Sequence, residues 1–285
     1  MTDSRTDLGF EVGTRLEEAP GRHGRTGVIH TPHGPIQTPA FIPVATKATV
    51  KTLTPEQIRQ TGAQAILSNA YHLYLQPGPD VVDEAGGLGA FMNWPGPTFT
   101  DSGGFQVMSL GVGFKKVLAM DTARLQADDI IAEGKERLAH VDEDGVTFRS
   151  HLNGDKHRFT PEVSIGIQHQ LGADIIFAFD ELTTLMNTRG YQERSLARTQ
   201  AWAERCLAEH GRLTAAHPGR PYQALFGVVQ GAQYEDLRRK AARDLRPRPA
   251  RRRRRGAGAA ARPRQPPSPR GRLRSCLRAG SCAGS

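Results

Sequence analysis

Residues 160–181 read TPEVSIGIQHQLGADIIFAFDE and predict a helix that leads directly into a buried strand. Thr160 and Pro161 are the residue types of a helix N-cap and a first helical position. Gly172 is suited to the left-handed conformation that closes a helix. Residues 174–179 are mostly apolar, as is typical of a strand that is covered on both faces of a parallel sheet. The stretch therefore predicts one helix–strand unit of an α/β fold.

Further units of the same kind occur along the chain. Residues 54–57 have the Thr-Pro-x-Gln pattern of a capped helix start and lead into the apolar segment 65–67. A long helix is expected over residues 192–210, because apolar residues recur on one side of it. These residues are Leu196, Ala203, Cys206 and Leu207. The recurring layout predicts a β/α repeat that continues to about Leu245.

Two tight-turn dipeptides interrupt this repeat. Asp144-Gly145 and Asn153-Gly154 are flanked by apolar residues between Val141 and Leu152. Asp-Gly and Asn-Gly are strong signals for the turns that join antiparallel strands. A β-hairpin insertion, outside the repeat, is therefore expected around residues 138–160.

The positive charge of the chain is concentrated at one end. The formal net charge is +9, but residues 246–285 hold 13 Arg and no Asp, Glu or Lys, which leaves 25 basic against 29 acidic residues in positions 1–245. Residues 246–285 also contain no Val, Ile, Phe, Tyr, Trp or Met. They cannot bury enough apolar surface to offset the entropy lost on ordering. We expect a folded part over residues 1–245 and a disordered Arg/Pro-rich tail over residues 246–285.

Three interpretations of this tail are open: a polybasic RNA-binding arm, the end of a flexible linker, and the out-of-frame translation of a G+C-rich coding sequence. The tail consists mainly of Arg, Pro, Ala, Gly and Ser, whose codons are G+C-rich or have G+C-rich forms. The β/α pattern also stops abruptly, before a core is finished. Both features favour the out-of-frame interpretation.

Composition also bears on disulfides, zinc and membranes. The three cysteines, Cys206, Cys276 and Cys282, are odd in number and lack a short ligand-like spacing, which argues against a disulfide framework and against a zinc knuckle. No apolar run approaches the ~20 residues that a membrane span needs. The first 30 residues contain no apolar core of a signal peptide. A cytoplasmic location without membrane contact is therefore expected.

Polar side chains follow three of the apolar segments. Asp101 follows residues 99–100, Asp180 ends the segment 175–179, and Gln230 ends the segment 225–229. In β/α barrels, side chains at such strand ends point into a shared active-site face. Taken singly, each also has a structural interpretation: a turn or cap residue for Asp101, a helix-capping acid for Asp180 and a solvated turn amide for Gln230. Their joint occurrence at three strand ends favours a site.

Other motifs give only weak evidence for a particular chemistry. Four histidines lack the i, i+4 spacing of a metal-binding helix: His72, His151, His157 and His169. Ser102 is not in a Gly-x-Ser-x-Gly pattern, so a nucleophilic serine is not indicated. The pair Gly103-Gly104 lacks the Lys-Ser/Thr of a phosphate-binding loop. It can instead let the backbone approach a planar ligand closely.

Several motifs, in order over some 200 residues, make the sequence similar to a known family. The sequence resembles the bacterial tRNA-guanine transglycosylases, also called queuine tRNA-ribosyltransferases. The segments that carry the resemblance are TPAFIPV (38–44), SNAYHL (68–73), TDSGGFQ (100–106), SHL (150–152), HRFTPE (157–162), FDE (179–181) and FGVVQG (226–231).

The resemblance implies a (β/α)8 TIM-type barrel, here incomplete at its C-terminal end, with the hairpin insertion and the tail outside it. It implies a pentosyltransferase that exchanges guanine at the tRNA wobble position for a 7-deazaguanine base in queuosine biosynthesis. The implied partners are tRNA, guanine or a 7-deazaguanine base, and a second copy of the chain in a homodimer. Which deazaguanine is used does not follow from the sequence.

The resemblance also assigns roles to particular residues. Asp101 is implied to be the general acid/base for the departing and incoming base. Asp180 is implied to accept hydrogen bonds from the guanine ring N–H and amino group, and Gln230 to donate to the opposite edge. Phe105 is implied to stack on the base, where relatives often have Tyr. The substrate-binding set is then Asp101, Ser102, Gly103, Gly104, Phe105, Asp180 and Gln230.

The sequence departs from the family after the Gln230 segment. The family attacks ribose with a second Asp beyond that strand, whereas no acid follows Asp244 here. The family's Gly-Gly-Leu segment has no counterpart. Cys276 and Cys282 have neither a third Cys nor a downstream His for the family's structural zinc. We therefore expect an inactive chain that binds no zinc. We also expect it to be poorly soluble or dependent on chaperones, because sheet edges are exposed.

Two alternatives remain. The first is a catalytically dead RNA-binding protein that uses its basic tail, whose RNA affinity would fall steeply as salt rises. The second is the archaeosine-type branch of the same superfamily, which usually has a further C-terminal RNA-binding domain for which this chain has no room.

Overall fold

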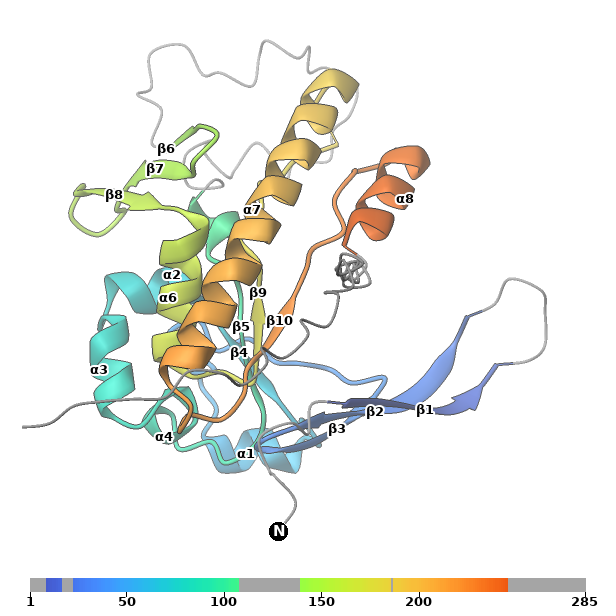
Figure 1. The fold of residues 1–285 in the computed structure, drawn as a ribbon. Helices are drawn as coiled ribbons and strands as arrows, with labels where there is room; N and C mark the ends of the chain where they lie inside the picture. The colour runs from blue at the N-terminus through green and yellow to red at the C-terminus, as the bar shows by residue number, and fades with distance from the viewer. Residues whose placement is uncertain (1–8, 17–22, 108–138, 186, 246–285) are drawn as a thin grey trace, which may run out of the picture. The chain divides into compact units, whose positions relative to one another are not determined.

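Four short parallel strands form the central sheet of the computed structural model, in the order β10-β9-β5-β4. They are β4 (Ile66–Ser68), β5 (Thr98–Thr100), β9 (Ile175–Phe177) and β10 (Ala224–Phe226). Val44 adds a parallel bridge to Leu67 beside β4. The structure describes residues 9–16, 23–107, 139–185 and 187–245 (Figure 1). β4, β5 and β9 are largely buried, as parallel strands generally are. Phe226 at the end of β10 is 38% exposed.

Helices connect these strands. The longer ones are α6 (Pro161–Leu171), α7 (Arg189–Ala216) and α8 (Glu235–Asp244). The shorter ones are α1 (Pro55–Gln60), α2 (Ala70–Leu75), α3 (Pro79–Glu84) and α4 (Leu88–Phe91). α6 and α7 pack against each other, and Figure 1 shows them side by side along the sheet. The sequence prediction of helix–strand units is confirmed.

The predicted helix ends are also present. Thr54 and Gln57 form a reciprocal capping box at the start of α1. The Thr160 side chain accepts a hydrogen bond from the Val163 N–H at the start of α6. Gly172 closes α6 with φ 70° and ψ 28°, the left-handed conformation that glycine adopts without steric cost. These local signals lie within a few residues, which is why the sequence alone predicts them.

Two boundary predictions need correction. The strand expected over residues 174–179 is limited to β9, Ile175–Phe177, although Ala178 N–H still donates to the carbonyl of Phe226 at 2.9 Å. The helix expected over 192–210 extends over Arg189–Ala216. Leu207, predicted on its apolar side, is 64% exposed, because its neighbour Cys206 takes the buried position and the next residue is rotated by ~100°.

The main buried cluster joins side chains of the parallel sheet, α6 and α7 with residues of α1 to α4 and of the inserted segment 146–159. Its largest fully buried side chains include Trp202, Tyr71, Phe159 and Phe179. Phe179 stacks on Trp202 with 5.0 Å between ring centroids, which joins the end of the β9 segment to α7. Cys206 is fully buried in the same cluster, so its predicted role as core filler is confirmed.

Two antiparallel sheets accompany the parallel one. β1 (Gly9–Arg15), β2 (Arg25–Thr31) and β3 (Gly34–Thr38) form the first, in chain order. β6 (Ala139–Val141), β7 (Val146–Arg149) and β8 (Lys156–Phe159) form the second. The predicted hairpin insertion is thus a three-stranded sheet, and both turn dipeptides lie between its strands.

The structure supports the α/β class with a parallel sheet. The barrel is not closed over the described residues, in which the parallel sheet has four strands. The described residues belong to one compact unit, Met1–Arg246. The tail predicted over 246–285, with Cys276 and Cys282, lies outside the described residues. Within the described part of the chain, no helix has the length and apolar character to cross a membrane.

Candidate active site

Asp101, Asp180 and Gln230 lie at the carboxyl ends of three neighbouring strands. Asp101 follows β5 directly, while Asp180 and Gln230 follow β9 and β10 within a few residues. β5 pairs with β9, and β9 pairs with β10, all parallel. Because parallel neighbours end at the same edge of a sheet, the three side chains come together there.

Asp101 is held by donors on both of its carboxylate oxygens. Asn69 Nδ2 and Gln106 Nε2 donate to Oδ2 at 2.6 and 3.0 Å. The Ala70 N–H donates to Oδ1 at 2.7 Å. Burial raises the pKa of Asp101, and these hydrogen bonds oppose the rise because they favour the charged form. The result is a rigidly oriented carboxyl group whose proton affinity is raised.

Asp180 forms the second half of the site. Ser102 Oγ donates to Asp180 Oδ1 at 3.2 Å, and Gln230 Nε2 donates to Asp180 Oδ2 at 2.5 Å. Burial raises the pKa of Asp180, and the nearby charge of Asp101 raises it further, while the bonds from Gln230 and Ser102 lower it. The structure therefore brings together three of the residues that the sequence singled out.

The Gly103-Gly104 pair permits this close approach. A Cβ on Gly104 would lie 2.8 Å from the carbonyl oxygen of Asp180 and 3.4 Å from its Oδ1. Gly103 has φ +79°, which strains other residues, and a Cβ there would meet the Phe159 ring at 2.9 Å. The glycines thus let the loop after β5 pack directly against the loop after β9.

Phe105 is placed differently from these buried residues. Residues 104–107 are helical, and Phe105 is 45% exposed. The Phe105 ring is therefore accessible from solvent, whereas Asp101 and Asp180 are only partly exposed.

The sequence of the chain matches a known family over most of its length. The model of the family described as queuine tRNA-ribosyltransferase matches residues 21–256. The chain belongs to the queuine tRNA-ribosyltransferase family. It is 50% identical over 221 residues to the queuine tRNA-ribosyltransferase of Geobacillus thermodenitrificans, with 78% of this chain and 50% of that protein covered.

Other family members match over similar lengths. The queuine tRNA-ribosyltransferase of Herpetosiphon aurantiacus is 49% identical over 227 residues, which cover 80% of this chain and 49% of that protein. That of Halalkalibacterium halodurans is 48% identical over 221 residues, with 78% and 50% covered. The chain therefore spans about half the length of the curated relatives it matches.

Sequence reasoning left the partners of the site residues unassigned. Asn69 and Gln106 belong to segments that carry the family resemblance, but neither was predicted to touch Asp101. Glu181 was noted only as the neighbour of Asp180, yet it is fully buried. Its partners are 10 or more residues away along the chain, so no local pattern predicts them. The one signal in the sequence is a second acid directly after a site acid at the end of an apolar segment.

Three of the histidines considered as metal ligands lie within hydrogen-bond distance of a tyrosine hydroxyl or of another histidine. His151 Nδ1 lies 2.9 Å from the Tyr71 hydroxyl, and His157 Nδ1 lies 3.0 Å from the Tyr74 hydroxyl. His169 Nε2 lies 2.9 Å from His210 Nδ1. Among the described residues, no group of three or more His, Cys, Asp or Glu is placed to hold a metal ion. The cysteines considered for the zinc that the family resemblance implies, Cys276 and Cys282, lie outside the described part.

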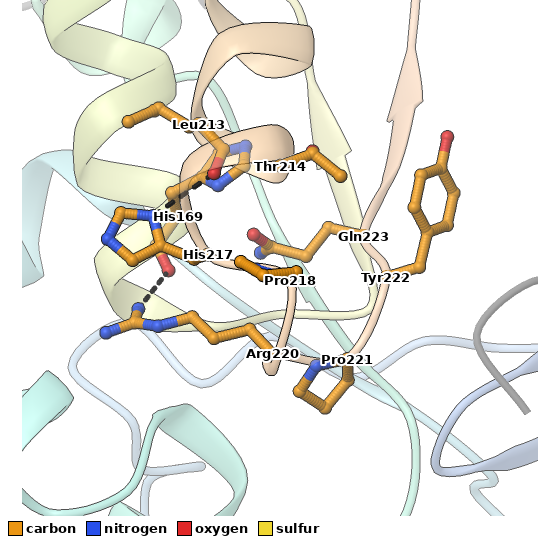
Figure 2. Close-up of a pocket in the computed structure, with 9 residues that line it drawn as sticks. All are labelled: His169, Leu213, Thr214, His217, Pro218, Arg220, Pro221, Tyr222 and Gln223. Carbon is orange, nitrogen blue, oxygen red and sulfur yellow. Dashed lines mark hydrogen bonds between the residues drawn. The ribbon is translucent and has the colours of Figure 1, made fainter.

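Two surface cavities lie away from the strand ends. One, of about 210 Å³, is lined by His169 of α6 and by residues between the end of α7 and the start of β10, among them Arg220 and Tyr222 (Figure 2). The other, of about 280 Å³, is lined by Ile58 of α1, by residues 61–64 that follow this helix, and by Phe41, Pro43 and Leu53. Neither cavity includes Asp101, Asp180 or Gln230, so neither coincides with the candidate active site of this chain.

Proposed function

We propose that this chain recognises guanine or a 7-deazaguanine base of tRNA and belongs to an enzyme that exchanges one for the other at the wobble position. The observation that carries the proposal is the hydrogen-bonded set Ser102–Asp180–Gln230 beside Asp101 at the ends of β5, β9 and β10. We propose further that these strands are part of a TIM-type barrel, as the family membership implies.

Base recognition follows from the donor and acceptor pattern of guanine. Its ring N–H and amino group are donors on one edge, and O6 is an acceptor. The Asp180 carboxylate accepts from the two donors, and Gln230 Nε2 donates to O6. Before the base arrives, Gln230 and Asp180 satisfy each other. Ser102 and the Gly103-Gly104 backbone keep Asp180 in place, while Phe105 stacks on the base.

Proton transfer is assigned to Asp101. When the bond between the base and ribose breaks, the departing base needs a proton, and the incoming base must lose one. A partly buried carboxyl group with a raised pKa suits this task, because its pKa is closer to neutral pH than that of an ordinary Asp. The donors from Asn69, Ala70 and Gln106 stabilise its charged form between the two transfers.

Attack on ribose is assigned to none of the described residues. The family resemblance places that carboxylate beyond the Gln230 segment, and no Asp or Glu follows Asp244. We therefore propose that the 285-residue chain, assayed by itself, binds the base without exchanging it.

Isothermal titration calorimetry with guanine and with 7-deazaguanine tests base recognition. The wild-type chain should bind, and Asp180→Asn should lower affinity by about 100-fold, because an amide places a donor against the donors of the base. Glu204→Gln, an equal charge change at an exposed position of α7, should leave affinity unchanged. Absence of binding to the wild-type chain would overturn the proposal. Incorporation of labelled guanine into tRNA tests the second statement, and measurable exchange would contradict it.

A further inference from the structure

A second carboxylate is buried directly beside the proposed base-binding residue Asp180. Glu181 is fully buried, and both of its carboxylate oxygens are paired. The Tyr191 hydroxyl donates to Oε1 at 2.6 Å, and Arg198 Nη1 donates to Oε2 at 2.5 Å. A buried carboxylate is costly unless it is paired and hydrogen-bonded. Glu181 therefore depends on these two partners.

Helix α7 also holds the backbone of Glu181. The Glu181 N–H donates to Thr199 Oγ1 at 3.1 Å, and Ser195 Oγ donates to the Glu181 carbonyl at 3.4 Å. Tyr191 and Arg198 are on the same helix. Four side chains of one helix thus fix a single residue, which is joined to Asp180 by a peptide bond.

Arg198 has a second partner on the inserted sheet. Its Nε and Nη2 donate to Glu143 Oε1 at 3.1 and 2.6 Å. Trp202 Nε1 donates to the Glu143 carbonyl at 2.7 Å. Glu143 lies in the turn between β6 and β7 and is mostly exposed. Arg198 therefore lies between one buried and one exposed carboxylate, and links the inserted sheet to the Asp180 loop.

We propose that Arg198 is a positioning residue for base recognition, because its contact with Glu181 sets the place of Asp180. The inference rests on the proposed function for the role of Asp180. Without the guanidinium, the buried Glu181 keeps the Tyr191 hydroxyl but has no counter-charge, so its carboxylate turns toward water. That movement shifts the Asp180–Glu181 peptide and loosens Asp180 from Ser102 and Gln230. Asp101 is held by other residues, Asn69, Ala70 and Gln106, and should stay in place.

The test compares Arg198→Met with Arg205→Met. Arg205 is on the same helix and pairs Glu162 at 2.7 and 2.8 Å, but it does not touch residues 180–181. Amide hydrogen exchange should accelerate at residues 178–184 in Arg198→Met and remain unchanged at residues 99–106. Arg205→Met should leave both segments unchanged. Unchanged exchange at 178–184 in Arg198→Met would overturn the proposal.

Affinity for guanine provides the second readout. Arg198→Met should weaken binding by at least about tenfold, while Arg205→Met should change it by less than about twofold. Glu181→Gln added to Arg198→Met should restore much of the affinity, because no buried charge then remains unpaired. A merely structural role would lower Tm in both Arg variants and leave the affinity of the folded protein unchanged.

The two readouts separate the two proposals. If the wild-type chain binds no guanine, the proposed function fails, whereas amide exchange at residues 178–184 still decides whether Arg198 positions Asp180. If Arg198→Met does not fold, Arg198→Lys keeps the charge but cannot contact Glu181 and Glu143 together. It should show the same exchange pattern to a smaller degree, and a wild-type pattern in that variant would contradict the proposal.

Discussion

Gln230 Nε2 donates a hydrogen bond to Asp180 Oδ2 at 2.5 Å, across 50 residues of sequence and between neighbouring strands. Each side chain is proposed to bind one edge of the base, so in the free protein each takes the place of the ligand for the other. The two side chains are therefore already oriented before the base binds. Changing either partner should alter both the free site and base binding.

Gln230→Glu should weaken guanine binding by about 100-fold near neutral pH. Two carboxylates at this distance cannot both be charged, and the one that is charged repels O6 of the base. Affinity should partly recover as pH falls, because a protonated Glu at 230 can donate to O6 while Asp180 stays ionised. Calorimetric titration at several pH values measures this. The control is Gln200→Glu, at a residue that faces Asp244 at the surface of α7 and α8. It should leave affinity unchanged. Equal loss of affinity in the two variants would refute the assigned role of Gln230.

Gly104→Ala and Gly166→Ala should have effects of opposite sign. A Cβ on Gly104 would meet the Asp180 carbonyl oxygen at 2.8 Å, so the loops after β5 and β9 must separate. We expect a loss of about 1–3 kcal/mol of unfolding free energy, together with loss of base binding. Gly166 is inside α6 with open space around its Cβ position, so alanine should stabilise the protein by about 1 kcal/mol. Chemical denaturation measures both, and a neutral Gly104→Ala would show that the close approach is not required.

Cys206 should resist alkylation in the folded protein. Burial raises the pKa of its thiol to about 12, and the thiolate is the reactive form. Iodoacetamide labelling followed by peptide mass spectrometry should find the Cys206 peptide unmodified under native conditions and modified in denaturant. Labelling under native conditions, at a rate close to that in denaturant, would contradict this placement in the core.

Unfolding free energy should fall as pH decreases from about 6.5 to about 4, in part because of the His169–His210 pair. Burial and the nearby charges of His210, His217 and Arg220 lower the pKa of His169 to about 4, and Glu209 opposes this. The unfolded state therefore binds more protons in this window, so the contribution is fully present above pH 6.5 and is lost as pH falls. Its size is at most about 3 kcal/mol.

His169→Gln tests this contribution. The pH dependence of its unfolding free energy between about pH 4 and 6.5 should be flatter than that of the wild type. Thr214→Val changes a residue without a titratable group in the same cavity (Figure 2) and should shift stability equally at every pH. A wild-type slope in His169→Gln would exclude the pair as a source of the pH dependence.

Local signals in the sequence determined the secondary structure near helix and strand ends. Thr54, Thr160 and Gly172 act through hydrogen bonds and backbone conformations within four residues of themselves, and the apolar runs before Asp101 and Asp180 mark strands. Family motifs then indicated which polar strand ends belong to one site. These features depend on neighbours in the chain, so they can be predicted without knowing the fold.

Tertiary structure alone decided the partners of those residues. Cys206, and not Leu207, is buried because the rotation of α7 is set by its packing against α6 and Phe179. Asn69 meets Asp101, and Arg198 joins Glu181 to Glu143, across separations of 17 to 55 residues. Such contacts depend on the order of the strands in the sheet and on the rotation of each helix about its axis. A carboxylate that becomes buried needs a nearby positive charge, and the packing of the elements decides which residue supplies it.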